Sequence, residues 1–137
     1  MHAHHERNET GALSIWVVLT TATAFLAVLG LVADGGRVLN ARAALDRAAA
    51  QAARAGADQL SAAGVRDGND DVSASQAITA AQNYLTAAGI QGTATVHGQT
   101  VTVTVHRAVG PQILGTFGMP TINVTETESA QGIQGGP

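Results

Sequence analysis

The sequence predicts an α+β protein in which a long N-terminal transmembrane helix continues into an Ala-rich amphipathic helix, followed by a short helix and a small antiparallel sheet of about three strands. Three observations predict this. Residues 11–33 contain no charged side chain. Apolar side chains in residues 34–64 recur every three or four positions, as on one face of a helix. From Gly92 onward apolar and polar residues alternate, which is typical of strands.

These patterns divide the chain into four parts. We expect a polar tail at residues 1–10, a transmembrane helix at 11–33, an αβ domain at 34–128 and a flexible tail at 129–137. The 104 residues after the apolar stretch suffice for one small domain.

Composition narrows the classes of function. The chain of 137 residues has no Cys, which excludes a disulfide framework, thiol catalysis and Cys-ligated zinc. All seven basic residues are Arg, and a net charge of −3 gives no argument for binding nucleic acid. The four aromatic residues include two in the apolar stretch, so the domain core must come from Ala, Val, Ile and Leu.

The apolar stretch, residues 11–33, reads GALSIWVVLTTATAFLAVLGLVA. As a helix it would be about 35 Å long, which is enough to cross a hydrocarbon core of about 30 Å. It is longer than the apolar region of a secretory signal, and no A-x-A cleavage site follows it. We therefore expect a retained membrane anchor.

Arginine counts give an orientation for this anchor. Arg7 precedes the stretch, whereas Arg37, Arg42 and Arg47 follow it. The positive-inside rule on its own places the C-terminal part in the cytoplasm.

The motif Asp34-Gly35-Gly36-Arg37 lies at the membrane junction. Two glycines in a helix interior cost about 1 kcal/mol each relative to Ala. Beside Asp34, a favourable N-cap residue, they predict either a kink or a new helix N-terminus.

The residues after this junction predict an amphipathic helix. Arg42 and Asp46 are spaced to pair at i, i+4. The small-residue stripe either packs on the chain's own sheet or binds a partner helix. Its members are Val38, Ala41, Leu45, Ala48 and Ala52.

A polar connection at residues 64–71 separates this helix from a second one. Ser73 and Gln76 form a capping box that predicts the start of the second helix, and Gly89 predicts its end. Its apolar face consists of Ala74, Ile78, Ala81, Leu85 and Ala88.

A hairpin follows, with Gly98-Gln99 as a two-residue type II′ turn. Pairing across this turn places Val96 opposite Val101, Ala94 opposite Val103 and Thr95 opposite Thr102. One face is then aliphatic and the other is a ladder of Thr. Pro111 predicts a short helical turn through Phe117, and a third strand at residues 121–127 is expected to bury Ile122 and Val124.

Residues that could carry catalysis do not form a pattern. His97 and His106 fall on the Thr face, but the predicted register puts them opposite Thr100 and Gln91, so they are not adjacent ligands. No nucleophile elbow, zinc-binding helix or phosphate loop occurs. The sequence predicts no enzyme, no metal site and no cofactor.

Taken together, these segments resemble the TadE/TadG-like proteins of the tight-adherence (Flp) pilus assembly system, of the small actinobacterial type. The resemblance covers roughly residues 6–130 and rests on GALSIWVVL, VADGGRVLNARAALDRAAAQAARAGA and the strand hairpin in that order. It implies a pilin-like fold and a membrane-anchored minor pilin or assembly factor. The implied partners are other pilin-like subunits, inner-membrane pilus assembly proteins, the lipid bilayer and prepilin peptidase.

The resemblance also implies a prepilin-peptidase cut between Gly11 and Ala12. The fifth residue of the resulting chain would be Trp16, where type IV pilins have a Glu that neutralises a neighbouring N-terminal amine. Either the chain is not processed, or it occupies a tip or assembly position that does not need this pairing. The family arrangement places the N-terminus in the cytoplasm and the domain outside, against the arginine count.

Two hypotheses follow from these observations. The first is a structural or assembly protein of a Tad-type pilus or related secretion apparatus, which predicts lateral helix–helix contacts. The alternative is a membrane-tethered extracytoplasmic binding or sensor module, which predicts a pocket in the αβ domain.

Overall fold

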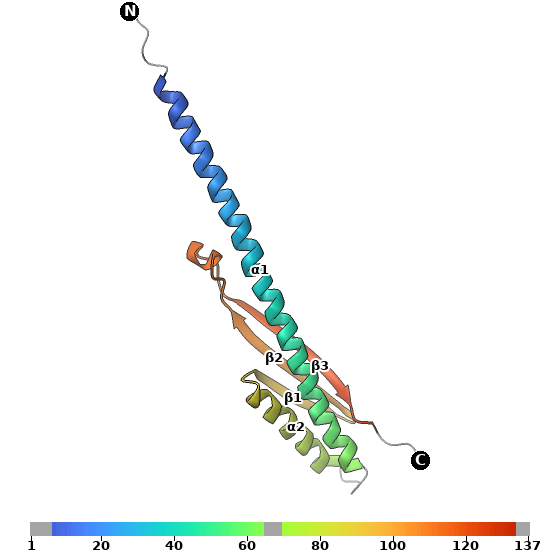
Figure 1. The fold of residues 1–137 in the computed structure, drawn as a ribbon. Helices are drawn as coiled ribbons and strands as arrows, with labels where there is room; N and C mark the ends of the chain where they lie inside the picture. Colours follow the sequence, from blue (N-terminus) through green and yellow to red (C-terminus); the bar gives the residue numbers. More distant parts are fainter. Residues whose placement is uncertain (1–6, 65–69, 134–137) are drawn as a thin grey trace, which may run out of the picture.

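The computed structural model describes residues 7–64 and 70–133, and shows a long helical rod with a small αβ domain packed along its C-terminal half (Figure 1). The rod is α1, Arg7–Gly64, and the domain adds α2, Asp70–Ala87, and a three-stranded sheet. The expected α+β class is confirmed. Most of the expected polar tail (1–6), the centre of the polar connection (65–69) and the last four residues (134–137) lie outside the described residues.

Helix α1 is continuous for 58 residues, about 87 Å at the usual rise. Of the two alternatives expected at Asp34, a kink or a new helix N-terminus, the new N-terminus is wrong, because α1 passes through Gly35 and Gly36 without interruption. Ala, the strongest helix former, is abundant after the two glycines and offsets their cost. The expected polar tail is also shorter, since residues 7–10 already belong to α1.

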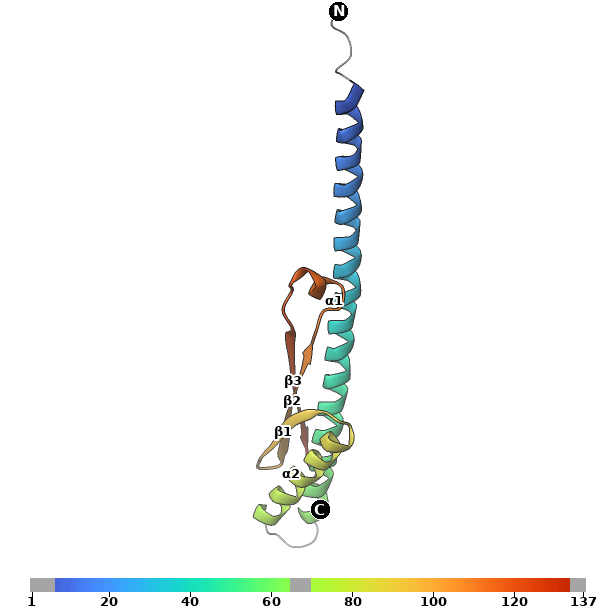
Figure 2. The ribbon, with the colours of Figure 1, turned by 90° about the vertical axis from the view of Figure 1, so that its left-hand side faces the viewer.

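The sheet has the order β1-β2-β3 and is antiparallel throughout. Its strands are β1, Gln91–His97, β2, Thr100–Val109, and β3, Ile122–Gln131. Figure 2 shows the sheet lying alongside the C-terminal half of α1. The stripe predicted on α1 thus packs on the chain's own domain.

The core lies between the apolar face of this sheet and the two helices. The Ala-rich stripe allows a close approach: a Cβ added at Gly56 would lie 2.9 Å from both the Ala77 carbonyl oxygen and Val101 Cγ1. The buried core residues are Leu45, Ala49, Ala52, Ala53, Ala57, Leu60, Ala77, Ala81, Leu85, Ala94, Val101, Val103, Val105 and Val124.

The predicted hairpin register is confirmed at every pair, including Val96 with Val101 and Thr95 with Thr102. Gly98 has φ of 58°, whereas no described non-Gly residue has positive φ, as a type II′ turn requires. On the Thr face, side-chain hydroxyl groups of β2 form hydrogen bonds with those of β3. The Thr102 and Ser129 hydroxyls lie 2.9 Å apart, and those of Thr104 and Thr127 lie 3.0 Å apart.

The third strand is longer than expected. It continues to Gln131, so residues 129–131, expected in the flexible tail, pair with β2. Val124 is buried as predicted, but Ile122 is 44% exposed. Ile122 points to the same face as Val124, yet it lies at the end of the sheet opposite Val109, where the core covers less of that face.

Helix α2 begins at Asp70, three residues before the predicted start, and ends as predicted. Gly89 has φ of 65°, and the Ile90 N–H donates to the Leu85 carbonyl at 2.9 Å while the Gly89 N–H donates to Thr86 at 3.1 Å. This is the bonding of a Schellman motif. The face that α2 turns to the core also includes Ala77, which the sequence pattern did not select.

Candidate functional site

The N-terminal part of α1 projects beyond the domain (Figure 1). Its apolar side chains are exposed. In the described part of the chain, α1 is the one helix long and apolar enough to cross a membrane. Burying such side chains elsewhere is strongly favourable, so lipid or another protein must cover them. Twelve large apolar side chains are 55–69% exposed: Leu13, Ile15, Trp16, Val17, Val18, Leu19, Phe25, Leu26, Val28, Leu29, Leu31 and Val32.

Two hydroxyl groups in this segment are already satisfied within the helix. Thr20 donates to the Trp16 carbonyl and Thr23 to the Leu19 carbonyl, each at 2.8 Å. A polar group without a partner would be costly in lipid. These bonds make the segment compatible with apolar surroundings.

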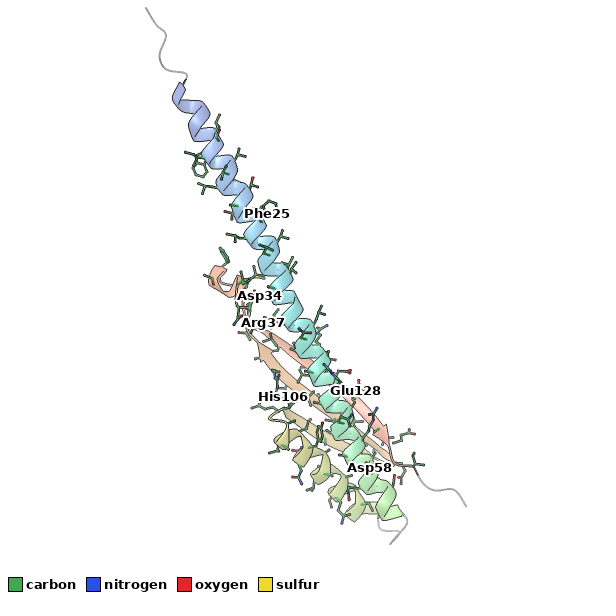
Figure 3. All side chains as sticks on the ribbon, viewed as in Figure 1. Phe25, Asp34, Arg37, Asp58, His106 and Glu128 are labelled. Carbon is green, nitrogen blue, oxygen red and sulfur yellow. The ribbon has the colours of Figure 1, made fainter. Side chains whose placement is uncertain are left out.

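Asp34 connects the end of this segment to the domain. Its carboxylate lies against the loop between β2 and β3, residues 110–121, which contains the short helical turn η1, Leu114–Phe117 (Figure 3). The N–H of Gln112 donates to Oδ1 at 2.9 Å. The N–H groups of Ile113 and Leu114 donate to Oδ2 at 3.1 and 2.8 Å.

These bonds explain why Asp34, an acid, is only 6% exposed. The first N–H groups of a helical turn have no partner within the turn, and a carboxylate is a good acceptor for them. The prediction that Asp34 caps the helix that follows it is wrong: Asp34 lies inside α1, and its carboxylate accepts N–H groups at the start of the η1 turn.

The same contacts lower the pKa of the Asp34 carboxyl below its ordinary value of 3.8. The Leu114 N–H lowers this pKa most, and partial loss of water opposes it. The N–H groups of Gln112 and Ile113 and the positive charge of Arg37 lower it further. Asp34 therefore stays ionised at neutral pH.

Gly30, one helical turn before Asp34, makes the second contact with this loop. A Cβ at Gly30 would lie 2.9 Å from Ile113 Cγ2 and 3.1 Å from Leu114 Cδ2. It is the buried position of the apolar stretch among the side chains that the structure describes. Sequence reasoning missed Gly30, because Ile113 and Leu114, which contact it, follow it by more than eighty residues.

The remaining predicted site residues are not brought together. Gly35 and Gly36 have open space where a Cβ would project, and Arg37 is exposed. Gly11 lies near the start of α1, about 35 Å along the axis from Asp34. The proposed processing position and the junction motif are thus separate places on one rod.

Charged groups elsewhere face each other between α1 and β3. Arg42 Nε lies 3.8 Å from Glu126 Oε1, so it pairs across the domain and not with Asp46, as the spacing had suggested. A hydrogen bond with Asp46 and its negative charge raise the pKa of Glu128 above 4.5. In residues 7–64 and 70–133, no three His, Cys, Asp or Glu side chains gather as metal ligands.

Comparison with protein families gives a match over part of the chain. Residues 11–59 match the model described as "Putative Flp pilus-assembly TadE/G-like", and the matched segment lies wholly within α1. Neither the curated proteins nor the solved structures include a match to the chain. Residues 11–59 are therefore similar to the TadE/G-like proteins of Flp pilus assembly.

Proposed function

We propose that this protein is a non-enzymatic, membrane-anchored minor pilin or assembly factor of a Tad/Flp-type pilus or related secretion apparatus. It acts through helix–helix packing of α1. The observation that carries this proposal is the uncovered apolar half of α1. The confinement of the family match to α1 supports it, because the resemblance then concerns the rod and not the sheet.

The proposed partners are other pilin-like subunits and inner-membrane pilus assembly proteins. Within lipid, helices associate through faces of small residues that let their backbones approach closely. A short stretch of one face of α1 has this character: Thr20, Ala24 and Ala27 follow the i, i+4, i+7 spacing, between the larger Trp16 and Leu31. Larger side chains, including Val18 and Phe25, lie on the opposite side.

Enlarging this face is the direct test of the proposal. We expect Ala24→Leu with Ala27→Leu to weaken association of α1 with its partners by roughly tenfold, which is about 1.4 kcal/mol. Val18→Leu on the opposite face adds bulk without blocking close approach and serves as the control. Association is measured by cross-linking in native membranes, together with counts of surface filaments. Equal association and filament numbers in all three strains would contradict the proposal.

We propose that the N-terminus lies in the cytoplasm and the domain outside, despite the arginines that follow the apolar stretch. The absence of Cys allows a clean test. Tyr84→Cys, on the exposed side of α2, should react with a membrane-impermeant maleimide in intact spheroplasts. Labelling only after lysis would reverse the orientation, and labelling of the lysed sample controls for reactivity.

Prepilin peptidase is a further proposed partner, cutting between Gly11 and Ala12. In the structure this bond lies inside α1, so the peptidase must unwind the first turns to reach it. Intact-mass spectrometry of the membrane fraction should find a chain that begins at Ala12. A mass that includes residues 1–11 would exclude the cut.

A further inference from the structure

The loop between β2 and β3, residues 110–121, exposes large apolar side chains beside the membrane-facing part of α1. Phe117 is 69% exposed, Met119 51% and Ile113 40%. No charged residue lies between Arg107 and Glu126. A loop of a soluble surface would normally be polar, so this composition requires an explanation.

The position of the loop supplies one. Ile113 and Leu114 contact α1 at Gly30. Gly30 lies within the uncharged stretch, about 6 Å along the helix axis from Asp34. If α1 spans the bilayer through residues 11–33, this loop reaches the depth at which headgroups meet acyl chains. The loop lies beside α1 at Asp34 (Figure 3), so its exposed apolar side chains are then close to the exposed apolar side chains of α1.

The hydrogen bonding of the loop suits this depth. Of the eight N–H groups in residues 112–119, three donate to Asp34 and three, from Thr116, Gly118 and Met119, donate to carbonyls within the loop. Pro111 and Pro120, on either side, have no N–H. Backbone that leaves water must have its polar groups paired internally, and most donors of this loop are paired.

We propose that the β2–β3 loop is a second membrane contact, which inserts Phe117 and Met119 into the headgroup and acyl-chain boundary of the leaflet on the domain side. The inference rests on the proposed membrane anchoring of α1 and adds a lipid-binding role for the domain. Together, α1 and the loop fix the depth and the tilt of the rod. The occupant of the apolar surface is lipid, because the loop lies against α1 at Gly30 and Asp34, where the proposed membrane span ends.

Tryptophan fluorescence tests this contact in the full chain. Trp16 is the single Trp, so Trp16→Phe gives a background without Trp. In that background Phe117→Trp is compared with Phe25→Trp, in the middle of the apolar stretch, and with Tyr84→Trp on α2. Each protein is reconstituted in vesicles of equal parts phosphatidylcholine and phosphatidylglycerol, with or without brominated acyl chains. Bromine placed near the glycerol end reports shallow positions.

We expect the Trp at position 117 to emit at short wavelength and to lose intensity with shallow-brominated lipid, while the Trp at position 84 loses none. Emission at the wavelength of water-exposed Trp would overturn the inference. So would short-wavelength emission without quenching, which would mean that protein covers the loop. Quenching at position 25 without quenching at position 117 would overturn the proposed loop contact and leave the membrane anchoring of α1 intact. No quenching at position 25 by lipid brominated near the end of its acyl chains would defeat the anchoring on which the proposed function depends.

Discussion

At the scale of single residues, Asp34 is the residue that couples the rod to the domain. One carboxylate serves three backbone donors of a loop almost eighty positions later in the chain, at 2.8–3.1 Å. Hydrogen bonds to an ionised acceptor are stronger than those between neutral groups. A single side chain therefore holds the β2–β3 loop against α1 at the membrane junction.

Replacing Asp34 should release this loop. We expect Asp34→Asn to speed amide hydrogen exchange at Gln112, Ile113 and Leu114 more than at any strand residue, because a neutral amide offers one acceptor oxygen. Asp58→Asn, an exposed acid on the same helix, is the matched control and should leave these amides unchanged. Unchanged exchange in Asp34→Asn would show that Gly30 and the side chains of the loop hold it without the carboxylate.

The pH dependence of this contact has a defined sign. The pKa of Asp34 is lower in the folded chain than its ordinary value of 3.8, so its contribution to stability is fully present above pH 3.8. That contribution is lost as the pH falls below 3.8 through the folded-state pKa. The stability difference between wild type and Asp34→Asn, measured by urea unfolding in detergent, should therefore shrink in acid. A difference that persists unchanged to strongly acidic pH would contradict this assignment.

At the scale of elements, α1 is one helix with two different surroundings. The first half of α1 has exposed apolar side chains, and the second half packs against α2 and the sheet. The glycines along it have different roles. Gly35 and Gly36 have empty space beside them, whereas Gly56 lies where α2 and β2 approach α1 most closely.

Alanine substitutions separate these roles. Gly36→Ala should stabilise the fold by about 0.5–1 kcal/mol, since Ala favours the helix and meets no neighbour. Gly56→Ala should destabilise it by about 1–3 kcal/mol, because its methyl group would press on the Ala77 carbonyl and Val101. Urea unfolding in detergent micelles measures both. Loss of stability in Gly36→Ala would mean that the junction works as a hinge that Gly must permit.

At the scale of the whole molecule, the domain is held together by a thin core. Among the residues that the structure describes, seven of the fourteen buried core residues are Ala, so the few larger side chains supply much of the buried area. On the edge strand β3, Glu126 and Glu128 occupy the face that turns toward α1. Inward-pointing charges on an edge strand discourage pairing with other chains.

The thin core makes the domain sensitive to single truncations. Leu45 is fully buried, and Leu45→Ala should reduce the free energy of unfolding of the domain by about 2–5 kcal/mol. Leu39→Ala, 66% exposed on the same helix, should change it by less than about 0.5 kcal/mol. Hydrogen exchange of β2 amides measures both effects. Both variants should remain in the membrane fraction, because the apolar part of α1 is untouched, and equal losses of stability would refute a core centred on Leu45.

Local pattern by itself determined most of the elements. The uncharged stretch at 11–33, the Ala-rich stripe and the hairpin with its register each depend on neighbours in sequence, where periodicity and turn chemistry decide the outcome. The family resemblance likewise depended on these contiguous segments. Errors in the elements lay at their ends, at the start of α2 at Asp70 and at the extension of β3 to Gln131. The extension of β3 depends on pairing with β2, about thirty residues earlier in the chain.

Only the tertiary structure decided what Asp34 and Gly30 do. From sequence, Asp34 beside two glycines looked like the start of a helix, because N-capping is a local rule. Its actual partners, the N–H groups of Gln112, Ile113 and Leu114, follow it by about eighty residues. No periodic pattern links positions so far apart. That contact arises only when β2 and β3, packed along α1, bring their connecting loop to the edge of the apolar stretch.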